Sequence, residues 1–141
     1  MDPNTLMKAI EDEKNEYLFH LTRKKIRENI LHVLKDLHLS KKNLKEIYDK
    51  LKEYKYVDEM NELKYGTYIR WISLNDPTNI YLTKGAIFCE VKITDDGVFC
   101  VCKNFGFSPK YFQIMIDENL IFQKLTEQEK ILLLAIEHLN S

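Results

Sequence analysis

The 141-residue sequence has little of what marks disulfide-rich, low-complexity or membrane proteins. It contains three cysteines, three prolines and four glycines. Its longest unbroken apolar run is Ile131–Ile136, whereas a transmembrane helix needs about 20 mostly apolar residues. Acidic residues among the first twenty positions interrupt any apolar core of a secretory signal. We therefore expect an intracellular protein that does not enter a membrane and that folds around its own core.

The cysteines are few and odd in number, and catalytic motifs are missing. Cys89, Cys100 and Cys102 fit a reducing compartment with free thiols, because a zinc site that also used His138 would lack paired ligands at the usual spacing. Buried cysteines of a sheet are the better interpretation. Phosphate-binding glycine loops, a nucleophile elbow and the His-Glu-x-x-His pattern are also absent. The sequence thus predicts no enzyme, no catalytic residue, no metal and no cofactor.

Neither sign of charge dominates, but the charge is unevenly distributed. Lys and Arg number 21 against 22 for Asp and Glu, so the formal net charge is −1. Residues 1–19 carry two basic and five acidic residues, residues 20–55 carry eleven and five, and residues 56–141 carry eight and twelve. The total excludes a generally basic nucleic-acid binder, whereas the middle segment, at +6, still provides a local basic surface.

Two helices are predicted in the N-terminal part. Apolar residues recur at mostly helical spacing from Tyr17 to Leu37, and the residues before them either extend this helix or form a separate short one. Ser40 is a good N-cap for a second helix, which we expect from Lys41 to about Tyr54. The short connection predicts an antiparallel helical hairpin.

The pattern then changes to strands and ends in a helix. Strand-like segments occupy residues 67–74, 80–82, 86–94, 98–103, 111–116 and 120–125. Asp95-Asp96-Gly97 predicts a hairpin turn, the following strand is apolar on both faces and therefore central or covered by helices, and Thr126 with Glu129 forms a capping box. Ile87, Cys89, Val91 and Ile93 are expected on one face of their strand. We predict an α+β fold with an N-terminal helical hairpin, an antiparallel sheet or partly closed small barrel of four to six strands, and a C-terminal helix.

Residues 1–56 would form the helical arm and residues 57–141 the β domain with its helix, together as one compact unit. The arm carries the candidate phosphate contacts Arg23, Lys24, Lys25, Arg27, Lys41, Lys42 and Lys45. Tyr54, Tyr56, Tyr65, Tyr68 and Trp71 are candidate stacking residues, although packing between sheet and helices also explains them.

One part of the sequence resembles a known group of proteins. The stretches 63–72, 82–86 and 120–125 read LKYGTYIRWI, LTKGA and LIFQKL. They are similar to strands of small uncharacterised proteins of large nucleocytoplasmic DNA viruses, in which two glycines occupy the place of Gly85-Ala86. The resemblance implies a viral protein that acts in the cytoplasm or nucleus of an infected cell, or in the virion, and it implies no catalytic residues.

Arg70 lies among apolar neighbours in the first of these stretches. Because an unpaired buried charge is costly, we expect it to need an acidic partner or main-chain carbonyls, and we name it a structural ion-pair candidate rather than a ligand for an anion.

Taken together, these features predict a non-enzymatic binding or adaptor protein. It would act through protein–protein contacts, with itself as a homodimer or with another protein. The alternative is a nucleic-acid-associated factor in viral transcription or genome packaging that uses the basic segment 20–55.

Overall fold

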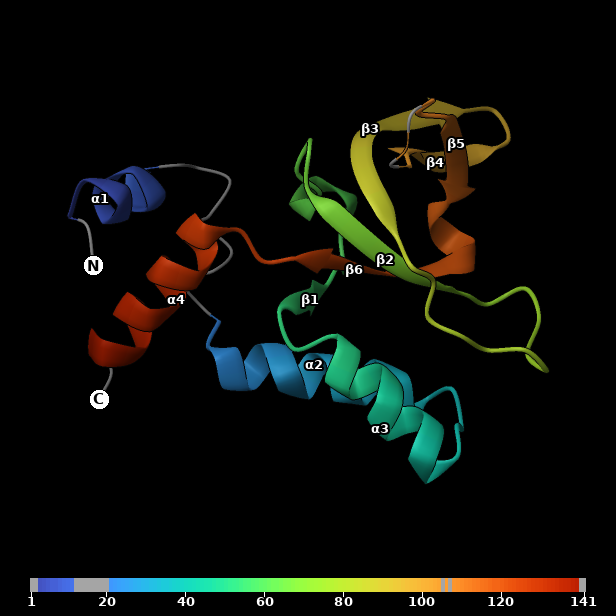
Figure 1. The fold of residues 1–141 in the computed structure, drawn as a ribbon, viewed down its shortest axis with the longest axis horizontal. Helices are drawn as coiled ribbons and strands as arrows, with labels where there is room; N and C mark the ends of the chain where they lie inside the picture. The colour runs from blue at the N-terminus through green and yellow to red at the C-terminus, as the bar shows by residue number, and fades with distance from the viewer. Residues whose placement is uncertain (1–2, 12–20, 105, 107, 140–141) are drawn as a thin grey trace.

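The computed structural model describes residues 3–11, 21–104, 106 and 108–139. Within them the chain is α+β, as the sequence predicts, with three helices before a six-stranded sheet and one helix after it (Figure 1). The helices are α1 Pro3–Glu11, α2 Arg23–Lys35, α3 Lys41–Lys50 and α4 Glu127–Leu139, with short 3₁₀ turns η2 Met60–Glu62 and η3 Ile116–Glu118. The strands are β1 Tyr54–Tyr56, β2 Tyr68–Ser73, β3 Ala86–Thr94, β4 Gly97–Lys103, β5 Tyr111–Met115 and β6 Asn119–Lys124.

The helical hairpin forms where the sequence places it, and local capping explains its helix starts. The Thr22 hydroxyl accepts a hydrogen bond from the Lys25 amide at 3.1 Å, and the Ser40 hydroxyl accepts one from the Asn43 amide at 3.2 Å. The expected extension of the second helix to Tyr54 is wrong, because α3 ends at Lys50 and Tyr54 begins β1. Tyr17, the predicted start of the first helix, lies outside the described residues.

The sheet is entirely antiparallel and open, with the order β1-β6-β2-β3-β4-β5. β2 and β3 share only two residue pairs, and β3 curves away so that β4 and β5 stand to one side (Figure 1). β4 has a neighbour on each side, which makes it an interior strand as predicted. The segment 80–82, predicted as a strand, is irregular, and Thr83 instead exchanges hydrogen bonds with the Trp71 backbone.

A bulge changes the predicted face of β3. Phe88 pairs with Cys102 and Glu90 pairs with Val101, so Cys89 is the extra residue. Ala86 and Phe88 are buried before the bulge, and because one extra residue reverses the alternation, Val91 packs against the same core after it, whereas Ile87 is on the other face. The expectation that Ile87 and Val91 share a face is therefore wrong.

Two apolar cores lie on either side of β2 and β6. The first joins all four helices to the sheet and includes Ile30, Leu34, Phe122 and Leu132. The second lies within the curved sheet, where Ile69, Phe88, Cys100, Cys102 and Ile121 are buried. Consecutive residues of β6, Ile121 and Phe122, thus enter different cores, which fixes the helices and the curved sheet to the same strand.

Candidate functional site

The basic candidates of the helical hairpin do not form one cluster. Arg23 is tied to α4, because its guanidinium binds the Glu137 carboxylate with a closest approach of 2.9 Å. Arg27 joins the two helices of the hairpin: its guanidinium lies 3.8 Å from the centre of the Tyr48 ring and donates to the Tyr48 carbonyl at 3.3 Å. Both arginines therefore have structural partners within the chain.

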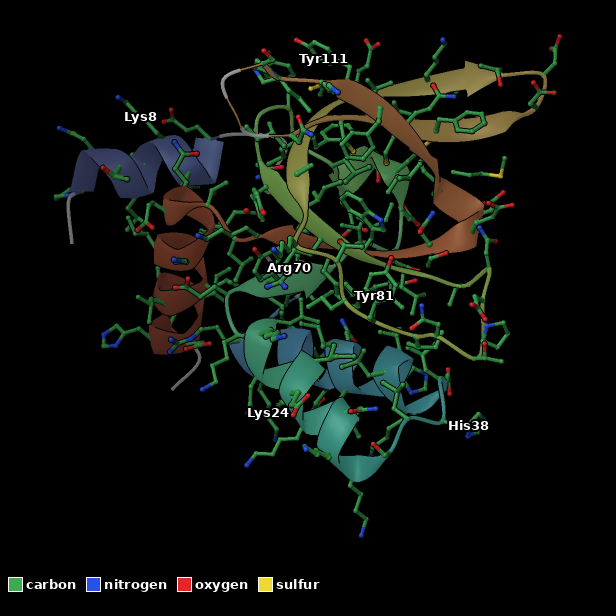
Figure 2. The ribbon with its side chains drawn as sticks, turned by 45° about the vertical axis from the view of Figure 1, so that its right-hand side comes forward. Lys8, Lys24, His38, Arg70, Tyr81 and Tyr111 are labelled. Carbon is green, nitrogen blue, oxygen red and sulfur yellow. The ribbon has the colours of Figure 1, made fainter. Side chains whose placement is uncertain are left out.

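The other five candidates are exposed lysines at two ends of the hairpin. Lys24 and Lys25 begin α2, whereas Lys41, Lys42 and Lys45 occupy the first turns of α3. The hairpin is antiparallel, since Arg27 near the start of α2 reaches Tyr48 near the end of α3. Lys24 and the turn residue His38 accordingly lie at opposite ends in Figure 2. None of the ion pairs between described residues includes these five lysines.

The predicted stacking aromatics serve mainly in packing. Tyr54 is buried in the helix-facing core, and Tyr56 packs on Phe122 with ring centres 5.8 Å apart. Trp71 packs on Phe112 at 5.9 Å. Tyr65 is the exception, at 80% exposure. Of the predicted stacking residues, Tyr65 therefore has the most exposed ring for the stacking that single-stranded nucleic acid requires.

Arg70 is bound by main chain. Its Nε donates to the Thr83 carbonyl at 2.8 Å, which anchors the loop that returns to β3. No ion pair among the described residues includes Arg70, so a carbonyl takes the place of the acidic partner.

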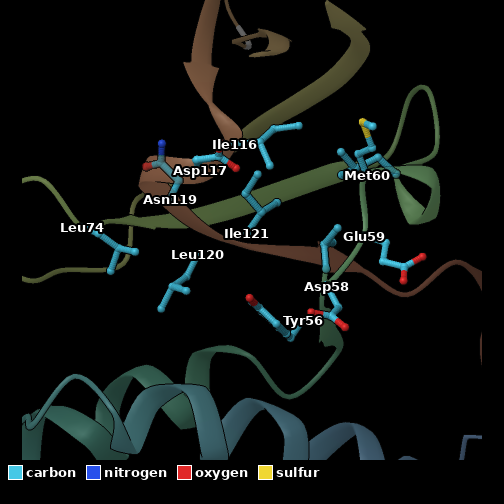
Figure 3. Close-up of a pocket in the computed structure, with 12 residues that line it drawn as sticks. Tyr56, Asp58, Glu59, Met60, Leu74, Ile116, Asp117, Asn119, Leu120 and Ile121 are labelled. Carbon is cyan, nitrogen blue, oxygen red and sulfur yellow. The ribbon is translucent and has the colours of Figure 1, made fainter. Parts of the chain in front are cut away.

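A different site lies beside β6, next to the residues of β6 that have no partner in the shorter strand β1. β1 pairs with residues 122–124 of β6, and Val57 makes one further bond to the Ile121 carbonyl at 2.8 Å. Within the described residues no strand covers Asn119 and Leu120 on this side. The chain turns away into η2, which leaves a recess of about 220 Å³ beside the open end of β6 (Figure 3).

We call this recess the acidic notch. It is lined by Tyr56, Val57, Asp58, Glu59, Met60, Leu63, Leu74, Ile116, Asp117, Asn119, Leu120 and Ile121. Two of its large apolar side chains are solvent-exposed, Met60 at 46% and Leu74 at 39%. Asp58 and Glu59 stand on one side and Asp117 on the other (Figure 3). The notch thus combines apolar walls with three exposed carboxylates.

The wall that carries Asp58 and Glu59 is held rigidly. The Glu62 carboxylate accepts hydrogen bonds from the Asp58 amide at 2.9 Å and the Glu59 amide at 2.7 Å. It also binds the buried Lys55 ammonium at 3.1 Å. Burial lowers the pKa of Lys55, and the Glu62 charge opposes that shift. These contacts fix the backbone that presents the rim carboxylates.

Gln123 fixes the chain just beyond that wall. Its amide oxygen accepts from the Lys64 amide and the Thr67 hydroxyl, both at 2.8 Å, and its nitrogen donates to the Glu62 carbonyl at 3.0 Å. Gln123 is fully buried, so each of these bonds replaces water that cannot enter.

The notch has a negative electrostatic environment. Burial raises the pKa of the Tyr56 hydroxyl, and the charges of Asp58 and Glu62 raise it further. Tyr56 therefore remains a protonated donor at neutral pH, beside carboxylates that accept only. This arrangement is suited to a cationic group with an apolar stem.

Sequence reasoning missed the notch because its residues come from distant segments. Asp58 and Glu59 follow a three-residue strand, while Asp117 lies about sixty positions later. The one available signal was Asp117-Glu118-Asn119, which reads simply as a turn.

No protein-family model, curated protein or solved structure matches the chain. In the parts that the structure describes, no group of three or more His, Cys, Asp or Glu side chains is arranged to hold a metal ion. None of the described helices is long and apolar enough to cross a bilayer.

Proposed function

We propose that this chain is a non-enzymatic protein-binding module that docks a basic side chain of a partner protein in the acidic notch. The observation that carries the proposal is the pairing of exposed Met60 and Leu74 with the carboxylates of Asp58, Glu59 and Asp117 around one recess. The resemblance of residues 63–125 to proteins of large DNA viruses supports a viral adaptor that works inside the infected cell.

The chemistry of the notch selects a lysine or arginine. Such a side chain places its methylene groups against apolar walls while its charged end stays at the wet rim. Val57, Ile116 and Leu120 would contact the stem, and the rim carboxylates would contact the charge. An acidic side chain would meet like charges at the same rim, which gives the site its discrimination.

A titration followed by backbone amide NMR tests this proposal. The probe is an unstructured peptide of alternating lysine and leucine, compared with the same peptide carrying acetylated lysines. We expect shifts confined to residues 57–63 and 116–121 with the first peptide, and their loss with the second, because acetylation removes the charge and keeps the stem.

Matched variants locate the binding. Asp58→Asn with Asp117→Asn removes two rim charges, and Asp95→Asn with Asp96→Asn removes two from the distant β3–β4 turn. The first pair should weaken binding about tenfold and the second should leave it unchanged. Equal effects of the two pairs, or shifts elsewhere on the protein, would refute the proposal.

A second candidate function is contact with nucleic acid through the exposed lysines of the hairpin. The observation in its favour is that Lys24, Lys25, Lys41, Lys42 and Lys45 are all exposed. Its test is the salt dependence of binding to mixed DNA and RNA, which should be steep and should flatten when these lysines are neutralised. A native protein without a salt slope would remove this function.

A further inference from the structure

The chain carries its own candidate ligand for the acidic notch. Lys41, Lys42 and Lys45 are exposed and follow one another along the first turns of α3, with Lys45 four residues from Lys41 and three from Lys42. Their stems are long and their charges point into solvent. They have the chemistry that the notch selects.

The start of α3 is positively charged. The first turn of the helix contains no acidic residue, although acids are favoured there because the backbone dipole makes this end positive. Lys41 and Lys42 therefore place positive charge at the positive end of the helix dipole, where it is unfavourable. A carboxylate brought from outside would relieve this repulsion.

Neither charged surface is neutralised within the described part of the chain. The ion pairs there join Arg23 to Glu137, Lys55 to Glu62, Lys64 to Glu129, and Lys130 to Glu53 and Glu127. None of them uses a rim carboxylate of the notch or a lysine of α3. At the start of α2, Glu137 binds Arg23 and two lysines, Lys24 and Lys25, stay outside these ion pairs, whereas all three lysines at the start of α3 do, and this favours α3 as the docking element.

From this complementarity we infer that the acidic notch of one copy receives the start of α3 from a second copy. The inference rests on the proposed function and names the partner. Because each copy has one notch and one α3, a two-fold dimer makes the contact twice. The ribbon of the α2–α3 hairpin lies along the lower edge of Figure 3, below the labelled Tyr56 and Leu120.

Charge reversal of each half separately, followed by mixing, tests this inference. The α3 variant carries Lys41→Glu, Lys42→Glu and Lys45→Glu, and the notch variant carries Asp58→Lys, Glu59→Lys and Asp117→Lys. All six positions are exposed, and because the Glu59 carboxylate also caps η2, circular dichroism first checks that each variant is folded. In either homodimer both contacts would be between like charges. In the mixed dimer both are between opposite charges.

Sedimentation equilibrium gives the readout. We expect the native chain to dimerise, each variant to raise the dimer dissociation constant about tenfold or more, and the equimolar mixture to recover association. The control is Lys84→Glu with Lys92→Glu and Lys110→Glu, which changes the net charge equally at exposed body positions. This control should dimerise like the native chain. Variants that all behave alike, or a mixture that stays monomeric, would overturn the inference.

Cross-linking of the native protein provides evidence that needs no variant. A carbodiimide joins a lysine to a carboxylate by forming an amide, with the water taken up by the reagent. In a mixture of ¹⁴N- and ¹⁵N-labelled chains, we expect cross-linked peptides of hybrid mass that join residues 41–45 to residues 58–59 or 117. Cross-links confined to one chain would contradict the dimer.

The failure of this inference can be told from the failure of the proposed function. A native chain that stays monomeric and still binds the lysine peptide at the notch refutes the second copy as partner and leaves the docking function intact. A monomer that binds no such peptide removes both. An α3 variant that still dimerises but no longer binds nucleic acid would also overturn the inference. It would show that these lysines contact phosphate groups.

Discussion

Gly85→Ala, which adds a single methyl group, should strongly lower the stability of the fold. Gly85 precedes β3 with φ at +94°, a conformation that L-residues rarely adopt. A Cβ at this position would lie 2.9 Å from the side chains of Tyr68 and Arg70. It would approach the Ile69 carbonyl oxygen more closely still, and Ile69 is fully buried in β2 and cannot retreat. The resemblance noted above places a glycine at this position too.

A comparison with Gly66 separates the cost of a positive φ from the cost of steric overlap. The φ of Gly66 is +81°, yet a Cβ there would meet nothing within 4 Å. Alanine in this region of φ costs about 1–2 kcal/mol in either place. Alanine also lowers the conformational entropy of the unfolded chain, which stabilises both variants by ~0.4–1 kcal/mol. Both terms cancel in the comparison, so the difference between Gly85→Ala and Gly66→Ala measures the overlap alone.

Overpacking of a well-packed site costs about 1–3 kcal/mol, and a clash with fixed main chain should reach the upper end. We expect Gly85→Ala to lower the free energy of unfolding by about 3 kcal/mol more than Gly66→Ala. For a chain of this size that difference lowers Tm by about 10 °C. Thermal unfolding followed by circular dichroism measures it. Equal melting temperatures for the two variants would refute the assigned packing of this loop against β2.

Three further predictions concern the buried polar groups. Gln123→Leu removes the hydrogen bonds of the Gln123 amide to the Lys64 amide, the Thr67 hydroxyl and the Glu62 carbonyl, and urea titration should show that the free energy of unfolding falls by about 3 kcal/mol; a smaller fall than for Gln113→Leu at an exposed position would contradict the network. Glu62→Ala removes the carboxylate that binds the buried Lys55 ammonium and should cost about 3–5 kcal/mol, whereas Lys55→Met should cost less; the reverse order would show that this pair does not hold the segment. Burial raises the pKa of the Cys100 and Cys102 thiols to about 12. Above a pH of about 9 the unfolded chain therefore loses thiol protons that the folded chain keeps, and each thiol should lower stability by about 1.4 kcal/mol per pH unit. The Cys100→Ala, Cys102→Ala double variant should show a shallower decline, and parallel curves would exclude the assigned burial.

Local sequence signals predicted the local features well. Thr126 and Glu129 form the expected capping box, with hydrogen bonds of 3.1 and 2.9 Å between side chain and backbone. The β3–β4 turn lies at Asp95 and Asp96, where Thr94 pairs with Gly97. These features depend on residues only a few positions apart, so their chemistry is readable in the chain itself.

Features that depend on distant partners were missed or misassigned. Tyr54 continues a helical pattern, yet it forms β1 because β6 offers it a strand to pair with. Glu129 reads as a cap residue, but in the fold it is fully buried and also binds Lys64 across the chain at 3.4 Å. The bulge at Cys89 arises from the pairing of β3 with β4. It could not be predicted from the alternation of apolar and polar residues within β3.

By itself the sequence determined the α+β class, the helical hairpin, the start of its second helix at Ser40 and the uneven charge of the chain. These follow from periodicity, capping and composition, which act over one or two turns of backbone. The tertiary structure alone decided which basic residues are already engaged and which remain exposed. It also decided that Asp58, Glu59 and Asp117 surround one recess, because only the pairing of a short β1 with a longer β6 leaves the edge of β6 open.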